Sequence, residues 1–267
     1  MKKYIAIFIV LLNMSACQQS GQKPLTVVHL CDPQLGFGGF AADSARFEQA
    51  IRQVNELSPD MVVIAGDMVH DINDGHAVAT VRRQIDRLKP PVILTPGNHD
   101  IPEPVTPERL ERYRRLFGDD FKAVECKGRM IVSANSQLWR DAPAEETERN
   151  DRQLSEALQK AKKNGMPVIL VTHIPPFVTD IDEKDDYNNI SVTERNKLLE
   201  QLEQNGAVIW LSGHLHRTVN RRYGKITVLN GETTSVNFDK RPYGFRLLRI
   251  YPDGLHDWIF IPLNNMQ

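Results

Sequence analysis

The sequence has few cysteines, which excludes a fold held together by several disulfides. Only Cys17, Cys31 and Cys126 occur among 267 residues, and so few thiols cannot build a disulfide framework. Cys31 lies inside an apolar run, which predicts a small buried packing residue. A Cys31–Cys126 disulfide remains the alternative if the compartment is oxidising.

The chain also lacks an excess of charge of either sign. Its 33 Lys and Arg balance 34 Asp and Glu, for a net charge of −1. This balance gives no electrostatic case for nucleic acid or for a polybasic membrane patch, so we predict no nucleic-acid partner. With 41% hydrophobic residues, the chain can form a packed globular core. We expect one domain and a monomer.

An apolar run long enough to span a bilayer is missing as well. The stretch YIAIFIVLL at residues 4–12 is too short, and it follows the basic MKK that begins a typical signal peptide. The motif NMSAC then resembles a bacterial lipobox with cleavage before Cys17. We predict a lipoprotein signal peptide over 1–16, then a lipidated Cys17 with a tether over 17–24. The protein would be exported and anchored to a bacterial cell membrane, facing the periplasm or the cell exterior. An ordinary signal peptide cut nearby is the alternative, and it also exports the protein.

Residues 25–267 alternate between strand and helix patterns. Apolar runs at 25–31, 60–66 and 90–95 are separated by helical spacing at 40–59 and 77–89, which predicts a parallel sheet with crossover helices. The pattern continues with helices at 107–118, 148–165 and 191–206, a hairpin at 121–136, and strands at 166–173 and 207–214. The last third, at 225–230, 245–251 and 256–262, alternates like antiparallel strands. The predicted class is α/β.

Polar residues follow several of these strands at the point where each ends. A single Asp or His in such a place is usually a turn former or a surface residue. Ligands of open α/β sheets, however, collect at the carboxyl ends of the strands, and here five strand ends carry metal-ligating types. These candidates are Asp32, Gln34, Asp67, Asn98, His173, His214 and His216.

The donor types indicate the kind of metal centre. Carboxylate, amide and imidazole donors without thiolate suit Mn, Fe, Zn or Mg, and not a structural zinc site. The candidates are too many for one ion, so we predict two divalent ions with Asp67 between them. Such a pair clamps a phosphoryl oxygen and activates a bridging hydroxide that attacks phosphorus.

The motifs DPQ, GD, GNHD and GHLH, with His173 between the last two, resemble those of the calcineurin-like metallophosphoesterases. DPQLG, GNHDI, GDDF, NSQLW, DEKDDYNN and SGHLHR bring the chain closest to the subfamily of calcineurin-like phosphoesterase domain-containing protein 1. The resemblance implies a four-layer sandwich, in which two mixed β-sheets pack face to face between helices. It also implies the ligand sets: Asp32, Gln34 and His216 for the first ion, Asn98, His173 and His214 for the second, and Asp67 bridging.

The resemblance assigns the rest of the GNHD motif to catalysis. His99 would serve the phosphoryl group as general acid or transition-state stabiliser, and Asp100 would orient His99. Most of the wider family has His where this chain has Gln34. The first ion would then bind loosely or prefer oxygen, or Gln34 would not ligate at all.

The predicted activity is metal-dependent hydrolysis of a phosphoric ester, most simply a phosphomonoester. A phosphodiesterase acting on nucleotides or lipid head groups is one alternative, and a lipid-anchored binding protein without turnover is another. The acidic segment 174–191 would be a solvated loop or a lid that selects substrate. Further expectations concern single side chains. We expect His29 and Trp139 in the core, with the pocket wall as the alternative for Trp139. Arg217 would pair with a surface carboxylate or contact a phosphate oxygen, and His70 is a candidate to line the site.

Overall fold

A computed structural model describes residues 23–140 and 142–264. The predicted signal peptide and Cys17 lie outside the described residues. A five-stranded sheet has the order β11-β10-β1-β2-β3. Strands β1 (Leu25–Leu30), β2 (Met61–Ala65) and β3 (Val92–Thr95) are parallel, as predicted. Strands β10 (Gly244–Ile250) and β11 (His256–Pro262) extend this sheet in antiparallel register.

The second sheet has six strands in the order β4-β5-β6-β7-β9-β8. Its parallel centre is formed by β5 (Arg129–Ser133), β6 (Val168–Val171), β7 (Ala207–Ser212) and β9 (Ile226–Asn230). Strands β4 (Lys122–Cys126) and β8 (Val219–Tyr223) pair antiparallel at the two edges. Both sheets are therefore mixed.

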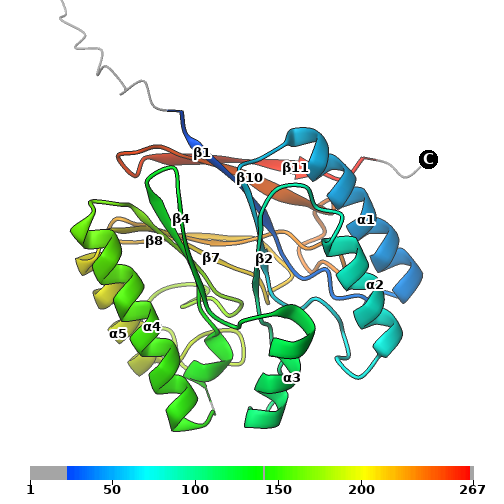
Figure 1. Ribbon diagram of the computed structural model, residues 1–267, viewed down its shortest axis with the longest axis horizontal. Helices are drawn as coiled ribbons and strands as arrows, with labels where there is room; N and C mark the ends of the chain where they lie inside the picture. The colour runs from blue at the N-terminus through cyan, green and yellow to red at the C-terminus, as the bar shows by residue number, and fades with distance from the viewer. Residues whose placement is uncertain (1–22, 141, 265–267) are drawn as a thin grey trace, which may run out of the picture.

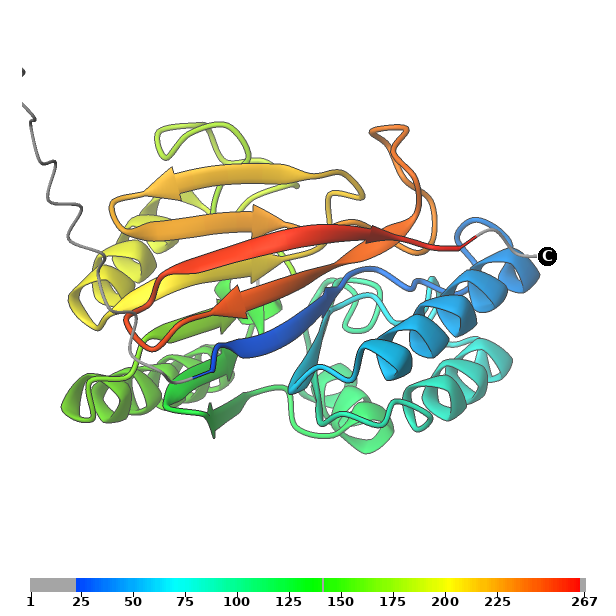
Figure 2. The same cartoon turned by 90° about the horizontal axis from the view of Figure 1, so that it is seen from above.

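Helices cover the outer face of each sheet (Figures 1 and 2). Helices α1 (Phe40–Leu57), α2 (Gly75–Ile85) and α3 (Pro107–Phe117) share a core with β1 and β2. Helices α4 (Ala144–Lys163) and α5 (Val192–Gln204) share another with the six-stranded sheet. A third core lies between the sheets, because alternate residues of one strand point to opposite faces. Leu25 and Val27 enter this inner core, whereas Val28 and Leu30 face the helices. The predicted four-layer sandwich is confirmed.

The sequence patterns located most elements but missed β8. Its residues VNRRY are mostly exposed at a sheet edge, so they lack the apolar alternation that marked the other strands. A 3₁₀ turn, η1 (Ser136–Trp139), was also missed. Cys31 and Cys126 are free thiols, so the alternative disulfide is not formed. Among the described residues, no helix combines the length and apolar character needed to cross a bilayer.

Candidate metal centre

The predicted ligands lie where the chain turns sharply after a strand. Asp32 and Gln34 follow β1, Asp67 follows β2, and Asn98 follows β3. His173 follows β6, and both His214 and His216 follow β7. Backbone φ is positive, between 37° and 73°, at Asp32, Gln34, Asp67, His214 and His216. Non-glycine residues rarely adopt this conformation, and such strain gathers at functional sites.

Two glycines let these turns approach one another. A Cβ atom on Gly97 would lie 2.1 Å from Oδ1 of Asp67, and one on Gly66 would lie 2.4 Å from Nδ1 of His173. Any side chain at either position would displace a candidate ligand.

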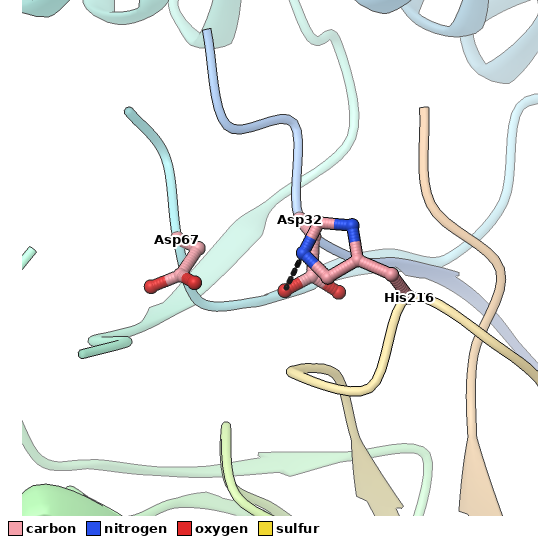
Figure 3. Close-up of side chains that lie close together, drawn as sticks. All are labelled: Asp32, Asp67 and His216. Atoms are coloured by element: carbon pink, nitrogen blue, oxygen red, sulfur yellow. Dashed lines mark ion pairs between the residues drawn. The ribbon is translucent and has the colours of Figure 1, made fainter. Parts of the chain in front are cut away.

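The two carboxylates are buried and held by backbone N–H groups. Asp32 accepts a hydrogen bond from the His214 N–H at 3.0 Å, and Asp67 accepts one from the His99 N–H at 2.9 Å. Nε2 of His216 lies 3.8 Å from Oδ1 of Asp32, with the Asp67 carboxylate beside them (Figure 3). One ligand atom from each of these three side chains lies within 4.8 Å of the others.

Backbone carbonyls set the tautomers of the three imidazoles. Because a carbonyl only accepts, the ring nitrogen facing it must carry the proton. Nδ1 of His173 donates to Ala65 O at 2.8 Å, and Nδ1 of His216 donates to Val236 O at 2.5 Å. Nε2 of His214 donates to the carbonyl of Tyr187 at 3.0 Å. The opposite nitrogen of each ring is therefore the one directed at the centre, where it would donate its electron pair to a metal ion, as in histidine ligands oriented from behind.

The nitrogens directed at the centre lie close to other possible ligand atoms. Nε2 of His173 lies 3.2 Å from Nδ1 of His214, 3.0 Å from Oδ1 of Asn98 and 3.3 Å from Oδ2 of Asp67. Burial alone would lower the pKa of His173, but the charges of Asp67 and Asp32 outweigh it and raise that pKa to about 9. For His214, burial and the neighbouring His173 lower the pKa to about 3. The cluster therefore attracts positive charge at its centre, as a cation site must.

Gln34 also fits a metal ligand. Its side chain is 1% exposed, and its buried Oε1 has no hydrogen-bond partner among the described residues. Leaving a buried acceptor unpaired costs about 1–3 kcal/mol. Gln34 lines the same pocket as Asp67, His214 and His216, so an ion there would satisfy this oxygen.

The structure corrects the role expected for Asp100. Its two oxygens accept hydrogen bonds from the backbone N–H groups of Met68 and Gly97, both at 2.9 Å. Nδ1 of His99 instead donates to the carbonyl of His70 at 2.6 Å. Asp100 therefore braces the two turns that carry ligands, and a backbone carbonyl orients His99. The sequence offered no signal for this, because any residue can supply a carbonyl.

Comparison with known proteins identifies the family to which this chain belongs. The family model for calcineurin-like phosphoesterases matches residues 25–218. The chain is a calcineurin-like metallophosphoesterase. It is 30% identical to the human protein named serine/threonine-protein phosphatase CPPED1 over 215 residues, which are 75% of this chain and 68% of the relative. The predicted family and the closer subfamily are both confirmed, and the chain is a hydrolase of phosphoric esters.

Two further relatives are more distant. A protein of Synechococcus sp. named probable cyclic nucleotide phosphodiesterase is 26% identical, over 86% of this chain and 87% of its own. The crystal structure of a dimetal phosphatase from Danio rerio superposes with a TM-score of 0.63 at 14% identity, covering 90% of this chain and all of the other. This last likeness supports the fold alone.

Aromatic residues that the sequence reading did not single out surround the metallophosphoesterase pocket. The pocket has a volume of about 410 Å³ and is lined by Phe37, Tyr187 and Phe238 beside the candidate ligands. Tyr187 belongs to segment 174–191, and its hydroxyl accepts a hydrogen bond from Nδ2 of Asn98 at 3.0 Å. The segment therefore borders the site, as its lid interpretation requires. The motif DEKDDYNN contains Tyr187, but a single tyrosine in an acidic segment forms no pattern that marks it as a pocket residue.

The remaining side chains divide between core and site. His29 is buried and its Nε2 lies 3.1 Å from Cys31 Sγ, as expected for a packing residue. Trp139 is also buried and donates to Asp151 at 2.8 Å. Arg217 is exposed at the rim of the pocket and forms no ion pair with a described carboxylate, so its predicted surface pairing is wrong. His70 stacks on His99, with ring centroids 4.8 Å apart.

Proposed function

We propose that the protein is a phosphomonoesterase that works with two divalent metal ions. The observation that supports this most directly is the convergence of oxygen and nitrogen donors from two sheets on one buried centre, where neighbouring donor atoms lie 3.0–3.3 Å apart. Asp32 and Asp67 place negative charge at this centre, which raises the pKa of His173 and which bound cations would neutralise.

The donors divide into two sets around Asp67. Asp32, Gln34 and His216 would hold one ion, and Asn98, His173 and His214 the other, with Asp67 shared between them. When bound, two such ions neutralise phosphoryl charge and lower the pKa of a water molecule toward neutrality. The protein's own contribution is to fix the donors in advance through the backbone hydrogen bonds described above.

His99 would act on the phosphate ester itself. Its Nδ1 is committed to the carbonyl of His70, so Nε2 is the nitrogen free to exchange a proton with the pocket. A ring nitrogen that faces the pocket can donate a proton to a leaving oxygen.

The substrate class follows from the relatives' names and the open pocket. We propose phosphoserine or phosphothreonine on a polypeptide, because several relatives near 30% identity carry the name serine/threonine-protein phosphatase. The purified protein, loaded with Mn²⁺, should hydrolyse p-nitrophenyl phosphate and a phosphothreonine peptide faster than bis-p-nitrophenyl phosphate. Faster hydrolysis of the diester would contradict the proposal.

The Synechococcus relative supports a phosphodiesterase as the second candidate. Assays with cyclic nucleotides in the same preparation distinguish the two. Release of nucleoside monophosphate from a cyclic nucleotide, without phosphate release from the phosphopeptide, would favour the second candidate.

We further propose that the protein is exported and anchored through a lipid on Cys17. Support comes from the apolar segment and the NMSAC motif. Cys17→Ala should abolish incorporation of labelled palmitate in a bacterial host and release the protein from the membrane fraction. Unchanged labelling would refute the anchor.

A further inference from the structure

A second hollow on the described surface is larger than the metal pocket. It has a volume of about 710 Å³ and lies between the edge strand β8 and strand β11, against the start of β7 and the turn joining β10 to β11. Figure 2 shows the β8–β9 hairpin running alongside β11 on the open side of the sandwich. We call this hollow the edge groove, and it is lined by Val208, Asn220, Arg221, Arg222, Lys225, Thr227, Asp253, Gly254, Leu255, His256 and Trp258.

The edge groove carries positive charge that the protein does not neutralise. Arg221, Arg222 and Lys225 line it against one lining carboxylate, Asp253. Among the described residues, none of these three cations forms an ion pair within 4.0 Å. Arg221 and Arg222 donate to backbone carbonyls instead. A partner that supplies carboxylates would therefore complement this surface.

The opposite wall of the edge groove is apolar and flat. Trp258 and His256 stack with ring centroids 6.4 Å apart, and Leu255 is 61% exposed beside them. Both nitrogens of His256 are engaged, one at 2.9 Å by Gly254 O and the other at 2.8 Å by Thr227 Oγ1. This histidine is therefore part of a rigid wall suited to apolar side chains.

The groove also exposes a strand edge. Asn220, Arg221 and Arg222 are consecutive in β8, and all three line the groove. Side chains of consecutive strand residues point to opposite faces, so the groove must reach around the edge of the strand. The carbonyl of Asn220 accepts from the Arg221 guanidinium at 3.0 Å. An extended polypeptide can pair with backbone groups at such an edge.

A smaller hollow adjoins the edge groove at the start of β8. It has a volume of about 210 Å³, shares Asn220 and Trp258 with the edge groove, and includes Thr218. Thr218 follows Arg217, which lines the metal pocket. The five residues of β8 span roughly 16 Å, which an extended chain covers in about five residues.

We propose that the edge groove docks an extended, acidic segment of the phosphoprotein substrate, at about five or more residues from the phosphorylated side chain. This inference rests on the proposed protein phosphatase function and adds a substrate-recognition surface to it. Carboxylates of the segment would meet Arg222 and Lys225, and apolar side chains would pack on Trp258.

The test compares three phosphothreonine peptides that share the residues next to the phosphate. Two carry a run of Asp and Glu about five residues away, on the N-terminal or the C-terminal side, and the third carries Gln there. For one of the two acidic peptides, the one whose acidic run lies on the side that reaches the edge groove, the full-length protein should have a KM at least about tenfold below that for the Gln peptide. Arg222→Glu with Lys225→Glu should abolish this difference without changing kcat or the hydrolysis of p-nitrophenyl phosphate. The matched control is Arg83→Glu with Lys89→Glu, which changes the net charge equally on exposed parts of the α2 side.

Three outcomes would overturn the docking proposal. Equal KM values for all peptides with the wild-type protein would do so, as would an equal effect of the control pair. The third outcome comes from tryptophan fluorescence, because Trp139 and Trp210 are buried and Trp258 is the more accessible indole among the described tryptophans. The unphosphorylated acidic peptide should change tryptophan emission in the wild type but not in Trp258→Phe. An equal change with inorganic tripolyphosphate would overturn the proposal, because it would indicate a site for small anions.

Failure of the proposed function would look different. The protein would then hydrolyse p-nitrophenyl phosphate but release no phosphate from any of the three peptides. The emission measurement decides the docking proposal in that case, because it needs no turnover.

Discussion

The five-stranded and six-stranded sheets bring different ligand atoms to the metal centre. Asp32, Gln34, Asp67 and Asn98 follow strands of the first sheet and offer oxygen. His173, His214 and His216 follow strands of the second and offer nitrogen. The first sheet thus supplies four of the seven candidate donors and the second supplies three, and each proposed ion needs donors from both. The centre can exist only when the inner core between the sheets is formed.

The hydrogen bonds that position the ligands also cross between the sheets. His173 donates to Ala65 at the end of β2, and the His214 N–H donates to Asp32 after β1. A ligand from one sheet is therefore oriented by the other. Packing and metal binding are therefore coupled here, because the donors converge only where the two sheets pack together.

The largest expected effect comes from removing the donor shared by both proposed ions. Asp67→Asn should lower kcat/KM for p-nitrophenyl phosphate by about 1000-fold or more, because it removes the charge placed between the two donor sets. Metal content, measured by mass spectrometry, should fall below two ions per chain. Asp71→Asn, at an exposed Asp nearby, is the control. Full activity in Asp67→Asn would show that the two proposed ions do not depend on Asp67 as a shared ligand.

His99 follows the oxygen-donating sheet but is not assigned to an ion. We expect His99→Ala to lower kcat about 100-fold, the size of a lost general acid, while metal content stays unchanged. Steady-state kinetics and metal analysis on the same sample check this. If the variant also lost an ion, His99 would be a ligand, and the division of donors by sheet would be wrong.

Gln34 allows the division of donors to be altered deliberately. Gln34→His would place nitrogen in the oxygen half, and we expect about a tenfold gain in Zn²⁺ affinity relative to Mn²⁺. Gln34→Ala should weaken one of the two binding steps by about tenfold in calorimetric titrations. Two unchanged binding steps in Gln34→Ala would mean that its unpaired oxygen does not ligate.

The smallest expected effect concerns His29, which lies in the five-stranded sheet and is not a candidate ligand. Burial, helped by the charge of Arg246, lowers the pKa of His29 to about 3. The unfolded chain, with an ordinary pKa near 6.5, takes up a proton that the folded chain does not. His29 therefore contributes no pH dependence above about 6.5, and it destabilises the fold as pH falls from there toward 3.

His29→Gln should reduce the slope of the free energy of unfolding against pH by up to about 1.4 kcal/mol per pH unit between pH 6 and 4. Urea unfolding of metal-free protein at several pH values measures this slope, with His76→Gln as the exposed control. An unchanged slope would mean that His29 is accessible to protons in the fold. Metal content should remain at the wild-type level, since His29 lies outside both donor sets.

Much of this arrangement could be predicted from the pattern of residues. Apolar runs in the sequence located ten of the eleven strands among the described residues. The polar residues that follow these runs indicated which side chains would lie close together. The exception, β8, has the sequence VNRRY with three exposed central residues, so its pairing to β9 was invisible to hydrophobic periodicity. The predicted role of Asp100 was wrong for a similar reason. Asp100 is next to His99 in the sequence, but the group that orients His99 is a backbone carbonyl 29 residues away.

The class of fold, the family and the donor types follow from the sequence alone, because strand periodicity and the chemistry of side chains at strand ends are local properties. The packed structure is needed to identify which nitrogen of each histidine faces the centre, which group orients His99, and where the cationic groove between β8 and β11 lies. Those features depend on carbonyls and edges that residues distant in sequence bring together. Backbone groups are the same in every residue, so no pattern of side chains can reveal where they will be used.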